Sequence, residues 1–361
     1  MSKATEPVVG NTEDTRIHGL DAARASMMLL GVLLHCVIFA GFFMESAGPE
    51  EGLAAFGIFS TIHTFRMPAF FLLAGFFASL LIAKRGSNGY LTNRAKRLGL
   101  VLLLLTPVLV PLTLLASGEF SSVQGVAGWV DKGFLHLWFV YYLLIISVIT
   151  YAISRIRMPE WVGKFQAHAA FWITDPKTLI IAPTILLAFP LFLDDGGRIR
   201  TSTSLVPDLA LLGFYALFFW FGSLLFSAGK DGLDALAKRG PVLFAVGFVA
   251  SQVTFALQVT QDVGPVTQLL SMVASFYLAF GVIGVFLRFA KTGGRVWAYL
   301  TRTSYWVYLV HLPIVDLSLR VLAYLGLPAL ATAFIAFFVS VAIALASFEL
   351  LVRKTPLAKL V

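Results

Sequence analysis

The chain consists largely of apolar runs of about 20 residues, separated by short polar stretches. A helix of that length crosses the hydrocarbon core of a bilayer, and in lipid a helix satisfies all of its own backbone hydrogen bonds. Hydrophobic residues make up 58% of the 361 residues, and charged residues make up only 13%. This composition excludes an ordinary soluble domain. It predicts an all-α, polytopic membrane helix bundle surrounded by the lipid bilayer.

We expect about ten membrane-spanning helices in this bundle. Their approximate ranges are 18–43, 55–83, 97–116, 134–154, 178–193, 205–227, 241–260, 265–288, 303–324 and 328–351. Residues 1–16 are polar and predict a disordered cytoplasmic tail, whereas 17–361 form a single transmembrane domain because no polar stretch is long enough for a second. Residues 155–177 mix aromatic with polar side chains, which predicts an amphipathic segment at the membrane surface.

The positive charges indicate the orientation of the bundle. If the N-terminus lies in the cytoplasm, the inner segments hold 21 of the 27 Lys and Arg residues. The outer segments then hold only Lys132, Arg198 and Arg200. The positive-inside rule therefore places both termini in the cytoplasm. The net charge of +8 is explained by this bias in the loops, so we expect no nucleic-acid partner.

The first predicted span carries charged side chains into the membrane. An arginine there costs about 3 kcal/mol of insertion free energy, so the presence of Arg24 in the span indicates a function for this side chain. His35 follows eleven residues later, which is about three helical turns, so both side chains project from one face about 16 Å apart. Asp21 lies one turn before Arg24 and is expected to pair with it. A polar seam of this kind predicts a functional site, because it must face protein or water.

Similar side chains recur in three other predicted spans. They are His63 and Arg66 in the second span, His136 and Trp138 in the fourth, and His311 and Asp316 in the ninth. The predicted topology places the histidines at middle to outer depth. If these helices are neighbours, they enclose a polar cavity that is open to the outside; the alternative is a set of separately satisfied polar groups in a bundle. No acid or thiol stands at ligand spacing beside the histidines, so we expect no metal site.

Four segments, in chain order, resemble signatures of the acyltransferase 3 family of membrane O-acyltransferases. They are Gly-Leu-Asp-Ala-Ala-Arg at 19–24 followed by His35, the Phe-Arg-Met-Pro run that opens 65–77, Arg-x-x-Arg at 94–97, and 304–313, which ends in Tyr-Leu-Val-His-Leu-Pro. Within the family, 63–67 and 136–139 are most similar to the branch that succinylates osmoregulated periplasmic glucans. That branch often has two adjacent histidines in the late motif, whereas here Leu312 follows His311.

This resemblance implies a multi-pass enzyme of the bacterial inner membrane that binds no permanent cofactor. It would take succinyl groups from cytoplasmic succinyl-CoA, an acyl-CoA, and transfer them to hydroxyls of a periplasmic glucan. The coenzyme A phosphates require cations, and Arg94, Lys96 and Arg97 stand on the cytoplasmic side, with Arg295 and Arg302 as second choices. Membrane topology alone is the competing explanation for these charges. Arg24 is expected to lie beside the pantetheine arm.

The histidine of the first span is the expected catalytic group. Imidazole titrates near neutral pH, so His35 suits the removal of a proton from a sugar hydroxyl. An acyl-histidine intermediate on His35 is the alternative. Either Arg66 or His63 is expected to stabilise the oxyanion. Arg66 has a second expected role, in which it binds the distal carboxylate of a succinyl group as a bidentate pair.

The remaining polar residues are expected on the acceptor side. His136, Trp138, His311 and Asp316 would contact the glucan, although Trp138 also fits the aromatic belt at the membrane interface. A proton-coupled transporter or flippase is the competing class, because buried polar residues on several helices also suit a carrier. The sequence shows no paired inverted repeats, which argues against that class. Acetylation of another surface polysaccharide is the alternative within the family.

Overall fold

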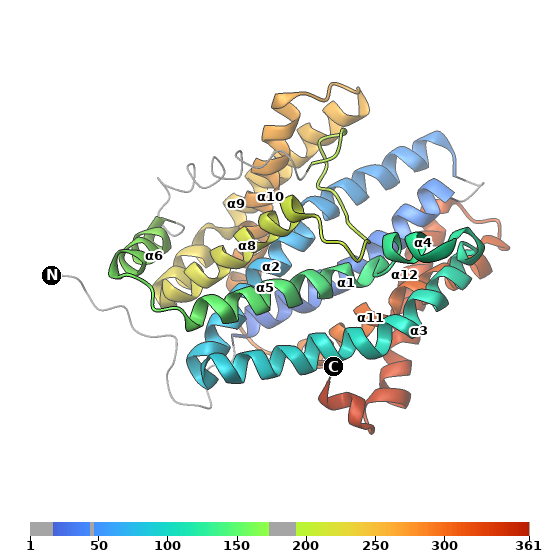
Figure 1. The fold of residues 1–361 in the computed structure, drawn as a ribbon. Helices are drawn as coiled ribbons and strands as arrows, with labels where there is room; N and C mark the ends of the chain where they lie inside the picture. The colour runs from blue at the N-terminus through green and yellow to red at the C-terminus, as the bar shows by residue number, and fades with distance from the viewer. Residues whose placement is uncertain (1–16, 44–46, 173–192, 361) are drawn as a thin grey trace.

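The computed structural model describes residues 17–43, 47–172 and 193–360, and within them it is a bundle of helices (Figure 1). The α-helices are α1 (His18–Phe43), α2 (Pro49–Arg94), α3 (Leu100–Ser117), α4 (Gly125–Asp131), α5 (Trp138–Arg155), α6 (Glu160–Trp172), α8 (Leu209–Ser227), α9 (Gly229–Val259), α10 (Pro265–Phe289), α11 (Arg295–Ala323) and α12 (Ala329–Ser347). The only β-pairing in the described residues is an isolated bridge between Leu193 and Ile199. The predicted all-α fold is therefore confirmed.

Eight described segments are long and apolar enough to cross a membrane. One of them, Pro49–Ser117, has 69 residues, and a straight helix of that length would measure about 100 Å. That exceeds two bilayer cores. The backbone turns at Gly86, where φ is +67° and ψ is 171°, so this segment supplies two crossings. The described helices thus account for nine of the ten predicted spans. The tail 1–16 and nearly all of the span predicted at 178–193 lie outside the described residues.

Several helices are longer than the predicted spans. Helix α2 begins at Pro49 rather than 55, and α9 begins at Gly229 rather than 241. Helical hydrogen bonding continues there into polar turns, which a count of apolar residues does not detect. The predicted surface segment contains α6, whose Trp161 is 67% exposed. Its Phe165 stacks on Trp220 of α8, with ring centroids 6.2 Å apart, so α6 is fastened to the bundle by an aromatic contact.

Helices α1 and α2 lie in the middle of the bundle, with α9 and α10 on one side and α3, α11 and α12 on the other (Figure 1). Helices α1 and α11 run in the same direction. Near their starts, the hydroxyl of Thr301 donates to the backbone carbonyl of Asp21 at 3.3 Å. Further along, the rings of His35 and His311 are in contact. This parallel pairing aligns the two spans that carry the predicted site residues.

Helix α2 crosses α8 at unusually short range because two glycines face each other's backbone. A methyl group at Gly75 would overlap the backbone of Phe219, and one at Gly222 would overlap the backbone of Leu72. Small residues are what allow membrane helices to pack this closely. The crossing fixes α2, and with it Arg66, against the rest of the bundle.

Candidate active site

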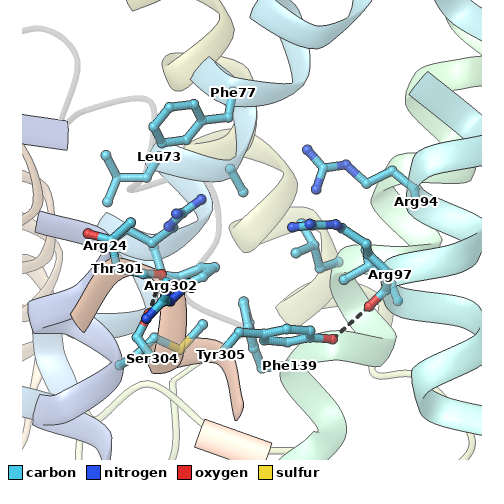
Figure 2. Close-up of a pocket in the computed structure, with 15 residues that line it drawn as sticks. Arg24, Leu73, Phe77, Arg94, Arg97, Phe139, Thr301, Arg302, Ser304 and Tyr305 are labelled. Carbon is cyan, nitrogen blue, oxygen red and sulfur yellow. Dashed lines mark hydrogen bonds between the residues drawn. The ribbon is translucent and has the colours of Figure 1, made fainter. Parts of the chain in front are cut away.

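Four arginines from distant parts of the chain line one pocket of about 310 Å³. Arg24 comes from α1, Arg94 from the end of α2, Arg97 from the short π-helix η1 (Ala95–Gly99) and Arg302 from α11. Figure 2 shows the guanidinium groups of Arg94 and Arg97 pointing from one wall toward Arg24 on the other. A pocket with this charge suits an anionic ligand, because guanidinium groups bind phosphates and carboxylates as planar forks.

Aromatic rings orient two of these arginines, and a carboxylate pairs with one of them. Arg24 lies 3.5 Å from the Asp21 carboxylate, in the position expected for their pairing, and 5.4 Å from the ring centroid of Phe77. Arg94 lies 5.3 Å from the ring centroid of Tyr90. Cation–π contacts orient a guanidinium and leave N–H donors free for other partners. Within the pocket, the aromatic contacts therefore orient Arg24 and Arg94, and the Asp21 carboxylate also pairs with Arg24.

The π-helix η1 carries two basic residues, which lie differently relative to the pocket. Arg97 lines it, whereas Lys96 is exposed and lies outside the lining, as does Arg295. The hydroxyl of Tyr305 donates to the backbone carbonyl of Arg97 at 2.8 Å, which ties η1 to α11 (Figure 2). Sequence reasoning grouped Lys96 with Arg94 and Arg97. The structure brings Arg24, Arg94 and Arg97 together with Arg302, one of the two second choices.

The wall of the pocket leads toward the predicted histidines. Phe139 lines the pocket, and its ring meets the edge of Tyr308 at a centroid distance of 5.6 Å. Tyr308 in turn lies 5.7 Å from the ring of His311 and 6.0 Å from that of His136. Two aromatic rings therefore separate the arginine pocket from the histidines.

Three of the four predicted histidines form one cluster. The ring of His311 lies 5.2 Å from that of His35 and 5.1 Å from that of His136, measured between centroids. They come from α11, from α1 and from the 3₁₀ turn η3 (Leu135–Leu137). We call His35, His136 and His311 the histidine cluster. Periodicity placed each of them on its own helix, and the packing of α1 with α11 brings them together.

Backbone carbonyls fix the protons on two of these rings. Nε2 of His136 donates to the carbonyl of Leu309 at 2.9 Å, and Nδ1 of His311 donates to the carbonyl of Tyr308. Each ring therefore has its other nitrogen free of a proton when the imidazole is neutral. Those nitrogens, together with Nδ1 of His35, are buried and have no hydrogen-bond partner among the described residues. Unpaired buried nitrogens at one place indicate a site for a hydrogen-bonding substrate.

Arg66 lies beside the histidine cluster. It is only 9% exposed, and its Nε is buried without a partner in the described part of the chain. Its guanidinium reaches α1 at Gly31, one helical turn before His35. A buried guanidinium with an unpaired N–H favours an anionic ligand, because leaving that donor unsatisfied costs free energy. Sequence reasoning did not anticipate the part played by Gly31.

Three predicted residues lie outside the histidine cluster. Nε2 of His63 donates to the carbonyl of Ile199 at 2.7 Å, outside the cluster. Trp138 is 6% exposed, and its ring packs against protein, including Tyr215 at 5.6 Å. Asp316 is partly buried on α11, five residues beyond His311, and so about 500° around the helix from it. Of the expected acceptor-side residues, only His136 and His311 belong to the cluster.

A family model described as an acyltransferase domain matches residues 17–349. Two curated relatives are both named Glucans biosynthesis protein C, one from Escherichia coli strain SMS-3-5 / SECEC and one from Escherichia coli O139:H28 strain E24377A / ETEC. Each is 25% identical to the chain over 329 residues, which covers 83% of this chain and 82% of the relative. No solved structure matches. The family match includes the arginine pocket, Arg66 and the histidine cluster.

Proposed function

The chain belongs to the acyltransferase family whose domain model spans residues 17–349, and from that membership we propose that it is a membrane O-acyltransferase acting on a glucan. The donor is an acyl-CoA, with succinyl-CoA as the preferred one. The acceptor is a hydroxyl of a periplasmic glucan, in keeping with relatives named for glucan biosynthesis. The enzyme acts in the bacterial inner membrane, with its donor side in the cytoplasm.

The arginine pocket supports a nucleotide-bearing donor. Coenzyme A carries several phosphate charges at one end, and the pocket offers guanidinium groups from Arg24, Arg94, Arg97 and Arg302. The positive-inside rule places this end of the bundle in the cytoplasm, where acyl-CoA is made. This pocket, next to a histidine cluster, is the observation that carries the proposal.

The pantetheine arm would run beside α1 from the pocket to the cluster. Arg24 and His35 are about 16 Å apart along that helix, a distance suited to a long, thin chain. Phe139 and Tyr308 stand between the two sites, so their rings would form the wall of the passage. The thioester then arrives at the level of His35, where a hydroxyl from the outer side can meet it.

His35 would act as the general base. It removes the hydroxyl proton while the sugar oxygen attacks the thioester carbonyl, and the tetrahedral intermediate expels the coenzyme A thiolate. The thiolate takes up the proton that His35 removed from the hydroxyl, which leaves the new ester and free coenzyme A. An acyl-histidine on His35 is the alternative course. Arg66 either stabilises the oxyanion or binds the distal carboxylate of a succinyl group, and its unpaired Nε suits both anions.

A proton-coupled transporter is the competing function, because unpaired histidine nitrogens would also suit a proton path. Thermal unfolding of the detergent-purified protein with succinyl-CoA, acetyl-CoA and free coenzyme A separates the two. A ligand at 100 times its Kd adds about 2.7 kcal/mol of stability. The largest shift with succinyl-CoA supports the whole proposal, and equal shifts remove the succinyl preference. No shift with any of the three favours the transporter.

A further inference from the structure

Pro313 interrupts the hydrogen bonding of α11 beside the histidine cluster. Proline has no backbone N–H, so the carbonyl four residues earlier loses its helical partner. That carbonyl belongs to Leu309, and it accepts a hydrogen bond from Nε2 of His136 at 2.9 Å. These two residues are 173 positions apart in the chain. The proline thus creates the acceptor to which His136 is attached.

The attachment determines which nitrogen of His136 carries the proton. A carbonyl oxygen can only accept, so Nε2 holds the hydrogen and Nδ1 keeps its lone pair. That Nδ1 is buried without a partner among the described residues, and the side chain is 6% exposed. His311 is fixed in the complementary way, through Nδ1, which leaves its Nε2 proton-free and also unpaired. Two neighbouring rings therefore hold lone pairs inside the cluster.

The backbone at His136 is also fixed by contacts with α11. Leu135, the residue before it, has a φ of +40°, which is uncommon for a bulky side chain. Such a conformation persists only where the surroundings determine it, and it is found most often at functional sites. Here the Tyr308 hydroxyl donates to the backbone carbonyl of His136. Adjacent residues of α11 thus hold His136 by its main chain and by its side chain.

We propose that Pro313 is a positioning residue of the acyl-transfer site: it frees the Leu309 carbonyl so that His136 keeps Nδ1 as a proton acceptor in the histidine cluster. The proposal rests on the function given above. The proton that His35 takes from the hydroxyl passes to a neighbouring ring nitrogen in the cluster. One N–H bond breaks on His35 and one forms on the cluster, which His35 contacts through the ring of His311, itself in contact with His136. When the coenzyme A thiolate leaves, that second N–H bond breaks and an S–H bond forms, so the cluster returns to its starting state.

The test compares Pro313→Ala with Pro107→Ala in α3. Alanine at 313 returns an N–H to the Leu309 carbonyl, which competes with His136 and frees its tautomer. We expect kcat to fall at least tenfold, while the thermal shift with succinyl-CoA and the Tm stay at or above those of the wild type. Pro107 also lies inside a helix, but it is exposed and is not among the residues that line the arginine pocket, so Pro107→Ala should keep the wild-type kcat. Wild-type kcat in Pro313→Ala would overturn the proposal.

If Pro313→Ala fails to fold, a second variant tests the same role of His136. His136→Gln keeps an N–H for the Leu309 carbonyl but has no ring nitrogen to protonate. We expect it to lose at least tenfold in kcat with an unchanged donor shift, and the double variant should be no slower than the slower single one. Full activity of His136→Gln would overturn the proposal.

Ring-nitrogen NMR of the histidine-labelled wild type reads the tautomer without any assay of transfer. Protonated Nε2 on His136 is expected, and protonated Nδ1 would contradict the geometry. This measurement is independent of the proposed function. If the wild type neither binds acyl-CoA nor transfers an acyl group, the proposed function fails even where the tautomer is the expected one.

Discussion

Gly31 of α1 faces the guanidinium of Arg66 so closely that a methyl group on Gly31 would lie 2.7 Å from Nη1. Only a residue without a side chain admits the guanidinium at this place, one turn before His35. The two residues meet across the contact between α1 and α2. The position of Arg66 thus depends on the absence of a methyl group at Gly31.

The first prediction is that Gly31→Ala displaces Arg66 without harming the fold. The end of a flexible arginine can move aside, and alanine is the better helix former by about 1 kcal/mol, so the Tm should hold or rise. A shift of a positioning group by about 1 Å can lower the rate of an enzyme a hundredfold. We therefore expect the displacement of Arg66 to lower kcat at least tenfold. Gly213→Ala in α8, where the added methyl meets open space, is the matched control and should leave kcat unchanged. Equal activity of the two variants would refute the role of this contact.

The second prediction concerns the base. His35→Ala should lower kcat by about 10²- to 10⁴-fold, the usual contribution of a general base, because no other group takes the hydroxyl proton. Donor binding should persist, since His35 lies outside the arginine pocket, and the thermal shift with succinyl-CoA reports it. Cys36→Ala, at the next position and buried, is the control and should retain transfer. Loss of the donor shift in His35→Ala would indicate misfolding or a binding role instead.

Local periodicity was sufficient for much of the site. The helical repeat placed Arg24 and His35 on one face, and the Arg-x-x-Arg pattern identified Arg94 and Arg97, which the structure brings into one pocket with Arg24. The separation of Lys96 from that pocket also follows from helical spacing. Lys96 is two residues after Arg94 and so points to another face, whereas Arg97 is three residues after it and shares its face. Sequence reasoning grouped the three residues by charge and did not apply this spacing to Lys96.

Contacts between distant segments explain what the sequence could not predict. A proline in a helix frees a carbonyl, and this can be read from the sequence, but the partner of the Leu309 carbonyl is His136, far away in the chain. The same holds for Nε2 of His63, whose partner is the carbonyl of Ile199 in a connecting segment. Helix ends also shift, because hydrogen bonding continues beyond the apolar run, as at Gly229.

The third prediction uses two adjacent cations. Arg97 lines the pocket and Lys96 does not, although both are exposed basic residues of one turn. A hydrogen bond to a charged group contributes about 1.5–3 kcal/mol, and because Arg97 is partly in water we expect the lower end, about a tenfold rise in the donor Kd for Arg97→Ala. Lys96→Ala should leave the Kd unchanged. Similar losses in both, measured by titration calorimetry, would mean that net charge rather than the pocket binds the donor.

The fourth prediction separates the two roles of Arg66. Lysine keeps the charge but lacks the planar fork that binds a carboxylate through two hydrogen bonds. If Arg66 holds the distal carboxylate, Arg66→Lys should lower kcat/KM for succinyl-CoA about tenfold more than for acetyl-CoA, since a pair of this kind contributes more than 1 kcal/mol. Arg302→Lys is the control: Arg302 lines the arginine pocket, where we propose that the coenzyme A phosphates common to both donors bind, so its effect should be equal for the two. Equal losses with Arg66→Lys would assign this residue to the oxyanion, because the oxyanion forms with either donor.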